Sequence, residues 1–352
     1  MRRRKSFLVI VASILVLAAI IALLVSRGHA PPEAARLLPA ADAYVYVNVG
    51  ALRSAGVFQN AGPISFEADY DQFVRETGFQ FERDLDTAAF AAHIASAPDS
   101  TQPEDTRYSE VFTGRFDRGK IVAYLKKLSA TTQRYRNLEI YAVPLPGRTV
   151  RLAFLNEGTV GASNTEGPYA LQGMIDRYQE LAWVSNGPDL VRQYYPEVPL
   201  GSVGWIVSRT GGPGGRNSSF VLPGGYNLFV PAGTVVVAAV RYLGAVQFRA
   251  EALARTEEDA RRLGDQLGAL LALTRALETS PQSGGNDPDV KAFFDSITLT
   301  QTARKTELSA TIPKGFVKKL VAEAPSLPAG SGLTPEKKPQ KHGRKTSRAP
   351  SR

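Results

Sequence analysis

Apolar and polar residues alternate along residues 43–49, AYVYVNV, in the way that a half-buried strand does. Strands are also expected at 87–95, which is rich in small residues, and at 108–116. The third strand runs into a predicted amphipathic helix at 117–130, because apolar residues recur there at helical spacing. The rest of this half is expected to contain a helix at 64–77, a hairpin at 137–156, a strand at 159–163 and a helix at 165–179.

The same order of elements recurs after residue 200. A long helix is expected at 256–278, where Thr256 and Asp259 provide a capping pair at its start. The other elements of this half are predicted strands at 203–209, 234–242 and 245–254 and a hairpin at 296–313. We therefore predict an α+β fold of two similar antiparallel-sheet-plus-helix units, 43–200 and 201–323.

Residues 114–121, GRFDRGKI, differ at one position from the phosphate-loop pattern G-x-x-x-x-G-K-[ST]. A phosphate loop needs a hydroxyl there to hold a metal ion, and this chain has Ile121 on the apolar face of the helix. The preceding strand alternates, whereas the strand before a phosphate loop is apolar throughout. We therefore interpret the stretch as a strand that runs into a helix capped by Asp117, and we expect no nucleotide binding.

Four basic residues at positions 2–5 precede an uncharged apolar run, 7–25. At about 1.5 Å per residue this run nearly spans a hydrocarbon core of about 30 Å. The sequence therefore predicts an N-terminal transmembrane helix, with residues 1–6 in the cytoplasm and the bulk of the chain extracytoplasmic. Two alternatives stay open. One is a cleaved signal peptide, which Pro31 and Pro32 disfavour, and the other is a buried core helix.

The formal net charge is +9, but the basic residues gather at the two ends. Residues 1–30 carry +5 and residues 333–352 carry +6, which leaves −2 for 31–332. A nearly neutral folded part argues against nucleic acid as a partner. Residues 26–42 are predicted to be a spacer, and 324–352 a disordered basic tail. The tail is a candidate for binding an anionic surface, and a solubilising role is the alternative.

The composition excludes several kinds of chemistry. The chain has no cysteine, which rules out disulfides and thiol catalysis. Its three histidines, His29, His93 and His342, are far apart and have no metal-ligand spacing. The sequence also lacks the motifs of serine hydrolases, zinc proteases and dinucleotide sites. We therefore assign no catalytic, cofactor-binding or metal-binding residue and expect no cofactor.

Several polar stretches have both a functional and a structural interpretation. The loop 211–219, GGPGGRNSS, is a candidate anion site, and 286–289, NDPD, is a candidate calcium loop. A flexible loop and a turn are the better interpretations. His93 is expected to be a packed or surface histidine, and both tryptophans are expected to be core residues. Candidate catalytic pairs come from acids that are more often caps or solvated positions: Asp69, Asp71, Glu76, Asp84 and Asp86.

Three stretches carry a resemblance to a group of uncharacterised bacterial proteins. They are LLPAADAYVYVNVGALRSAG, FERDLDTAAFAA and VFTGRFDRGKIVAYL with the later LEIYAVP. The chain resembles these exported, single-anchor proteins over roughly residues 37–322, through segments of the form LPADA-strand, G-F-x-x-x-x-D-L-D and G-R-F-D. The resemblance implies location and a duplicated α+β architecture. It implies no activity and no functional residue.

We predict a non-catalytic envelope protein that acts as a binding, scaffold or assembly factor. The lipid bilayer is its partner through 7–25, which would place it in the inner membrane. An envelope protein or an apolar ligand is a candidate partner between the two units. One alternative is an exported hydrolase with a non-standard active site, which predicts a perturbed carboxylate pair in a deep pocket. The other is a carrier, which predicts a closed apolar cavity between sheet and helices.

Overall fold

A computed structural model describes residues 30–57, 68–93, 106–128, 131–145, 147–180, 187–211, 218–222, 226–278 and 288–315. The described helices are α2 (Glu33–Leu37), α3 (Val49–Ser54), α4 (Ala68–Thr77), α5 (Phe81–Asp84), α6 (Arg118–Leu128), α7 (Tyr169–Glu180), α8 (Asp189–Tyr194), α9 (Glu257–Glu278) and α10 (Pro288–Ser296), with the 3-10 helix η3 (Tyr195–Glu197). The described strands of the first half are β1 (Ala43–Asn48), β2 (Leu85–His93), β3 (Arg107–Gly114), β4 (Thr131–Tyr135), β5 (Leu138–Leu145), β6 (Arg148–Asn156) and β7 (Thr159–Ser163). Those of the second half are β8 (Ser202–Arg209), β9 (Ser218–Leu222), β10 (Tyr226–Val230), β11 (Val235–Tyr242), β12 (Val246–Leu253), β13 (Thr298–Thr302) and β14 (Lys305–Ile312).

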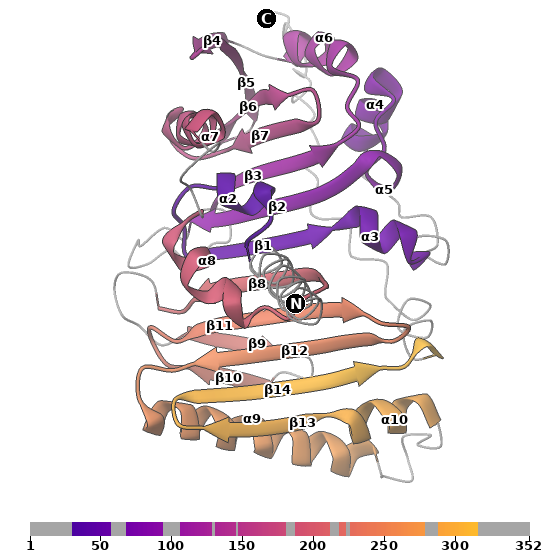
Figure 1. The fold of residues 1–352 in the computed structure, drawn as a ribbon, viewed down its shortest axis with the longest axis vertical. Helices are drawn as coiled ribbons and strands as arrows, with labels where there is room; N and C mark the ends of the chain where they lie inside the picture. Colours follow the sequence, from indigo (N-terminus) through magenta and orange to yellow (C-terminus); the bar gives the residue numbers. More distant parts are fainter. Residues whose placement is uncertain are drawn as a thin grey trace, which may run out of the picture.

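The described strands form one antiparallel sheet of 12 strands in the order β13-β14-β12-β11-β8-β1-β2-β3-β7-β6-β5-β4 (Figure 1). Strands β9 and β10 pair only with each other. Reading outward from the middle, β1-β2-β3 on one side is matched by β8-β11-β12 on the other. In each half the third strand is followed by a helix, α6 or α9. The two halves therefore repeat one order of elements about the β1–β8 pair.

The β1–β8 ladder joins the two halves. Tyr44 lies opposite Val207 and Tyr46 opposite Trp205. The rings of Tyr46 and Trp205 stack with centroids 5.6 Å apart. All four side chains are buried, and they point to the same side of the sheet. We call this side face A, and we call the opposite side, which carries Ala88 and Phe90, face B.

The first half is covered on both faces. On face A, Leu171, Met174 and Ile175 of α7 recur at helical spacing and are at most 1% exposed. They join the large core cluster that also contains Ala153 of β6. On face B, Ile121 of α6 joins a second cluster with residues of β5, β6 and β7. Alternate residues of each strand thus supply two separate cores, one under each helix.

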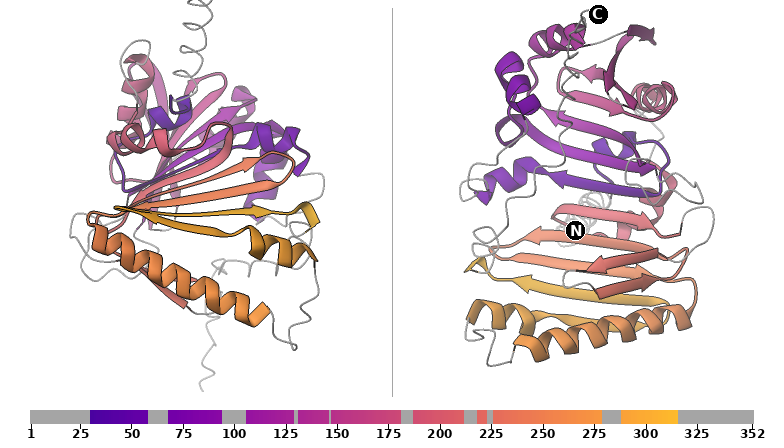
Figure 2. Two further views of the ribbon diagram at one scale, coloured as in Figure 1. Left: turned by 60° about the horizontal axis from the view of Figure 1, so that its bottom comes forward. Right: turned by 180° about the vertical axis from the view of Figure 1, so that it is seen from behind.

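The second half is covered mainly on face B. The helices α9 and α10 contact β14, and they lie on the side that faces away from the viewer of Figure 1 (Figure 2). The Thr306 hydroxyl of β14 donates a hydrogen bond to the Ala260 carbonyl of α9 at 2.8 Å, which fixes the helix on this face. Face A of β12 and β14 is bordered by η3 instead. Among the described elements, none covers the outer part of face A.

The stretch 114–121 is a strand that runs into a capped helix, as the sequence predicted. Strand β3 ends at Gly114, and the Lys120 amide donates to Asp117 Oδ1 at 3.1 Å before the first turn of α6. Ile121 is buried. A Cβ atom at position 114 would lie 2.4 Å from the Asp84 carbonyl oxygen. The glycine is therefore needed for the close approach of two backbones.

Most of the strongly patterned elements are found within a few residues of their predicted bounds. The hairpin turns lie at Gly147 and Ala303, which both have positive φ angles. Thr256 caps α9: the Asp259 amide donates to its hydroxyl oxygen at 3.1 Å. The sequence missed strand β4, the β9–β10 hairpin and the short helices α3, α5, α8 and α10. It also missed α2, which lies within the predicted spacer 26–42 and buries Ala35 and Leu37 in the core.

The predicted fold class was wrong in its first element and in how its units are joined. No helix in the described ranges is long and apolar enough to cross a membrane. The predicted transmembrane segment, 7–25, lies outside those ranges, as do the tail 324–352 and the stub 1–6. The two antiparallel-sheet-plus-helix units, 43–200 and 201–323, do not form separate sheets, because β1 and β8 pair along their length. The sheet therefore runs through both halves without a break.

The Tyr46→Ala substitution should test the junction between the halves. It removes a buried ring from the middle of the sheet, so we expect a loss of about 3–5 kcal/mol in the free energy of unfolding. The Val45→Ala control, on face B of the same strand, should cost about 1 kcal/mol. Urea unfolding followed by circular dichroism and by tryptophan fluorescence should give one transition for each variant. A second transition that the Tyr46 variant leaves unshifted would mean that the halves fold independently.

Candidate functional site

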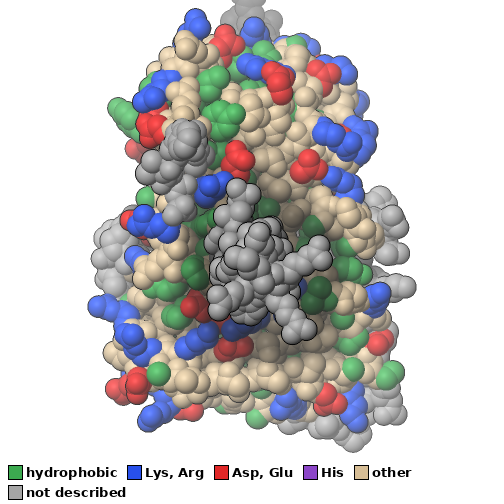
Figure 3. Space-filling model, in the orientation of Figure 1, with side chains coloured by type: hydrophobic (Ala, Val, Ile, Leu, Met, Phe, Trp, Pro, Cys, Tyr) green, Lys and Arg blue, Asp and Glu red, His purple; other side chains and the backbone are tan. Residues whose placement is uncertain are grey.

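The open part of face A is polar. Strand periodicity puts alternate residues of β12 and β14 on this face, and the register places them opposite one another. The pairs are Gln247 with Thr311, Arg249 with Ser309, Glu251 with Glu307, and Leu253 with Lys305. Figure 3 shows positively and negatively charged side chains next to one another in the lower half of this side of the molecule, as they also are in the upper half.

The two acids Glu251 and Glu307 lie directly opposite each other, which by itself is destabilising. Two cations on the neighbouring rows of the sheet offset the repulsion. Lys305 Nζ lies 2.6 Å from Glu251 Oε2 and 4.0 Å from Glu307 Oε2. Arg249 Nη2 contacts Glu251 Oε1 and lies 3.0 Å from Glu307 Oε2. Each acid is therefore shared between a lysine and an arginine.

The 3-10 helix adds a third carboxylate. Glu197 Oε2 lies 3.3 Å from Lys305 Nζ, which ties η3 to strand β14. Three carboxylates thus share two cations. We call the five residues the ion cluster: Glu197, Arg249, Glu251, Lys305 and Glu307.

Glu251 is the most buried member of the ion cluster, with 1% of its side chain exposed. Both carboxylate oxygens are buried, and in the described residues no donor meets them with good hydrogen-bond geometry. Burial therefore raises the pKa of Glu251 above its ordinary value, although Lys305 and Arg249 act in the opposite direction. The pKa of Lys305 is raised despite its burial, because the nearby carboxylates of Glu251 and Glu197 favour the charged lysine.

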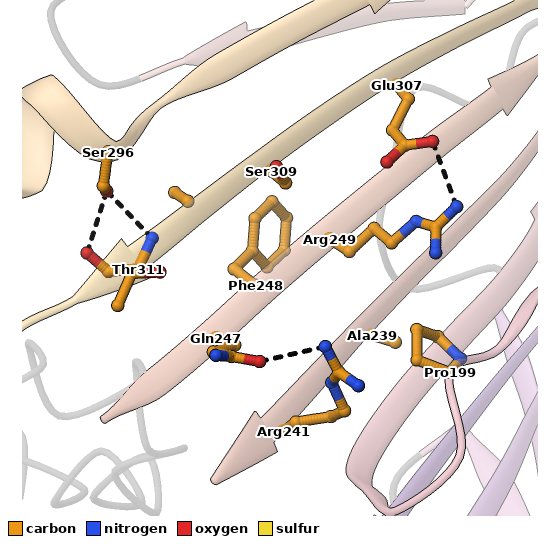
Figure 4. A pocket seen from close by; sticks show the side chains of 11 residues that line it. Pro199, Ala239, Arg241, Gln247, Phe248, Arg249, Ser296, Glu307, Ser309 and Thr311 are labelled. Carbon is orange, nitrogen blue, oxygen red and sulfur yellow. Dashed lines mark hydrogen bonds and ion pairs between the residues drawn. The ribbon is translucent and has the colours of Figure 1, made fainter. Parts of the chain in front are cut away.

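An open pocket of about 320 Å³ lies beside the ion cluster (Figure 4). We call it the trough. Arg249 and Glu307 belong both to the ion cluster and to the lining of the trough. The remaining lining includes Pro199, Ala239, Arg241, Gln247, Ser296, Ser309 and Thr311. Hydroxyl, amide and guanidinium groups thus predominate around the opening.

The side chains of the trough are held in place by hydrogen bonds. Arg241 Nη2 donates to Gln247 Oε1 at 2.9 Å (Figure 4). The Ser296 hydroxyl accepts from the Thr311 amide at 2.9 Å and donates to the Thr311 carbonyl at 3.0 Å. In the described part of the chain no acid pairs with Arg241, whose positive charge is therefore left without a counter-charge and makes one hydrogen bond to a neutral amide. This guanidinium is the group of the trough best placed to receive an anion.

Three of the acids that the sequence suggested for catalytic pairs are paired with basic side chains in the structure. Asp84 is buried and forms ion pairs with Arg83 and Arg115, and these cations and hydrogen bonds hold its pKa below the usual range. Asp86 pairs with Arg53 instead. Of the acids of α4, which are Asp69, Asp71 and Glu76, the last lies 3.0 Å from Lys127. Asp84, Asp86 and Glu76 therefore serve in structural ion pairs, and Asp71 is exposed on α4.

His93 is a packed residue, as predicted. Its Nε2 lies 3.0 Å from the Ser109 hydroxyl, and burial lowers its pKa. Trp205 is a core residue, and Trp183 lies outside the described ranges. Most of the glycine-rich loop at 211–219 lies outside them as well, and 286–289 ends in the first residues of α10. The described residues contain no group of three or more His, Asp or Glu side chains placed to hold a metal ion.

The sequence analysis missed the ion cluster and the trough. The sequence does indicate two strands that each have a polar face, because charged or polar residues alternate with apolar ones in VQFRAEAL and KTELSATI. What could not be read was the pairing of β12 with β14, which brings Glu251 and Glu307 together. The approach of Glu197 from η3 is likewise a tertiary contact with no local sequence signature.

No protein-family model matches the sequence, and neither does any curated protein. Among solved structures, the chain is similar to crystal forms of TP0453. Form III is 10% identical with a TM-score of 0.45, and the match covers 83% of this chain and 98% of that one. Form IV is 10% identical with a TM-score of 0.44, covering 83% and 96%. Form I is 9% identical with a TM-score of 0.42, covering 84% and 98%. This level of similarity carries no conclusion about function.

The raised pKa of Glu251 predicts a specific pH dependence of stability. The folded protein binds this proton more tightly than the unfolded chain, whose glutamate pKa is about 4.3. The contribution of Glu251 to the free energy of unfolding is therefore greatest below about pH 4.3. It is lost as the pH rises through the pKa that Glu251 has in the folded protein. The Glu251→Gln variant has no ionisable group at this position and therefore lacks this pH dependence. Urea unfolding at several pH values should show that the wild-type free energy of unfolding, minus that of the variant, falls as pH rises. A difference that grows with pH would show that the cations outweigh burial.

Proposed function

We propose that the chain is a non-catalytic extracytoplasmic binding protein, and that the trough holds a polar ligand or partner group bearing an acid. The observation that carries the proposal is Arg241, a guanidinium at an open, hydroxyl-lined pocket with only the Gln247 amide as its described partner. Guanidinium groups bind carboxylates and phosphates through paired N–H donors, which gives geometric specificity. Ser309 and Thr311 of β14 supply hydroxyls to the far wall of the pocket, across β12 from Arg241, for the neutral part of such a ligand.

The arrangement of the acids supports binding over hydrolysis. A hydrolase needs a carboxylate that can give or take a proton at the substrate. In the ion cluster, Glu307 lines the trough but is held by Arg249, and Glu251 is buried behind it. The carrier alternative calls for an apolar cavity between sheet and helices. Under α7 that space is filled by Leu171, Met174 and Ile175.

An extracytoplasmic location is part of the proposal and rests on the amino-terminal sequence alone. Basic residues 2–5 followed by the apolar run 7–25 are typical of a segment that directs export. Protease should therefore remove a carboxyl-terminal tag from cells whose outer barriers have been opened. A tag that stays protected until the cytoplasmic membrane is lysed would contradict this location.

The Arg241→Gln variant should test the trough. Citrate and inorganic phosphate serve as probes, measured by isothermal titration calorimetry with the full chain at low ionic strength. We expect the variant to bind either anion at least about tenfold more weakly, a loss of about 1.4 kcal/mol, because a charge-assisted hydrogen bond is removed. Arg262→Gln, an exposed arginine of α9 that pairs with Glu258, is the matched control and should bind as the wild type does.

Equal binding by the Arg241 and Arg262 variants would place the anion elsewhere. A wild-type protein that binds neither probe would show that the Arg241 charge does not create an anion site.

A further inference from the structure

A second pocket lies on face B of the first half, where strand β7 is shorter than its neighbours. β7 ends at Ser163, whereas β3 and β6 on either side of it extend further. The gap leaves a pocket of about 220 Å³, which we call the notch. Its lining includes Tyr108 and Glu110 of β3, Arg148 and Val150 of β6, and Asn164 beyond the end of β7.

Glu110 is a partly exposed carboxylate between two apolar residues of the neighbouring strands. Its cross-strand neighbours are Phe90 on β2 and Ala162 on β7. In the part of the chain that the structure describes, no hydrogen bond or ion pair reaches this carboxylate. Burial raises the pKa of Glu110, and the charge of Arg148 only partly offsets this. Removing an ionised carboxylate from water without a partner is costly, so the notch favours a ligand that supplies a positive charge or a donor.

Arg148 is the complementary group. It lines the same pocket from the opposite side of the β7 gap and is itself exposed. No ion pair within 4.0 Å joins Arg148 to Glu110 or to any other acid of the described residues. The notch therefore presents a carboxylate and a guanidinium that interact across a space rather than in contact. A ligand with one charge would pair with either Glu110 or Arg148 and leave the other charge of the notch unpaired.

We propose that the notch binds a small zwitterion, which places its ammonium group at Glu110 and its carboxylate at Arg148. Such a ligand neutralises both walls and gives the arginine the planar oxygen pair that its donors fit. The volume limits the ligand to a small molecule, because pockets for larger organic ligands begin at about 300 Å³. The site lies on the face opposite the trough and does not depend on the function proposed for it.

The experiment is a titration of the full chain with glycine, β-alanine and γ-aminobutyrate, in which the ammonium and carboxylate groups are progressively further apart. Ethylamine and acetate are the single-charge probes. Binding is followed by saturation-transfer NMR. We expect at least one zwitterion to bind at least about tenfold more tightly than either single-charge probe. Both Glu110→Gln and Arg148→Gln should reduce that binding at least about tenfold. Glu157→Gln, at an exposed acid that pairs with Arg118, should leave it unchanged.

Thermal unfolding without ligand gives an independent readout. The Glu110→Gln variant keeps the shape of the side chain and removes a charge that is partly withdrawn from water, so its midpoint temperature at neutral pH should rise. A direct ion pair between Glu110 and Arg148 in solution would instead lower the midpoint in both variants. That result, or zwitterions that bind no better than acetate and ethylamine, would overturn the proposal.

Discussion

The pairing of β1 with β8 is the constraint on which the rest of the structure depends. Each strand begins its half of the chain, and each would otherwise expose a row of unpaired backbone groups at a sheet edge. Antiparallel pairing along the ladder from Ala43–Ser208 to Val47–Gly204 removes both edges at once. The stacking of Tyr46 on Trp205 adds a packed contact at the same place. The two halves therefore share one sheet, although the strands that join them, Ala43–Asn48 and Ser202–Arg209, are far apart in sequence.

Joining the halves edge to edge makes the covering of the sheet unequal. The first half has α7 on one face and α6 on the other, so alternate residues of β5 and β6 pack into two separate hydrophobic cores. The second half has α9 and α10 on face B, while on face A the described η3 contacts β8 through Tyr195 and β14 through Glu197. Strands β12 and β14 accordingly carry apolar residues toward α9 and charged or hydroxyl residues toward the open side. The polarity of the trough is thus a consequence of which face the helices leave uncovered.

Local patterns predicted the parts of the fold that depend on local chemistry. The alternation of 43–49, the capping pair Thr256 and Asp259, and the helical spacing of Ile121 and Leu125 each led to an element that the structure contains. The pairing of β1 with β8 could not be predicted, because neither segment has a local sequence pattern that indicates the contact of Tyr46 with Trp205. The ion cluster could not be predicted either. Glu251 has the alternation of an ordinary strand residue, and its burial arises from Lys305, Arg249 and η3, which reach it only in the folded chain. The same holds for Glu110, whose isolation follows from the early end of β7.

We propose that the polar part of face A, which the described elements leave uncovered, is the binding surface of the protein. Site-specific photo-cross-linking in the cells that make the protein tests it directly. A benzophenone side chain would be placed at Ser309 in the trough and, separately, at Leu273, an exposed residue of α9 on the opposite face. Mass spectrometry after illumination should find an adduct of defined mass at position 309 and none at position 273. No adduct at position 309, or equal labelling at the two positions, would contradict the claim.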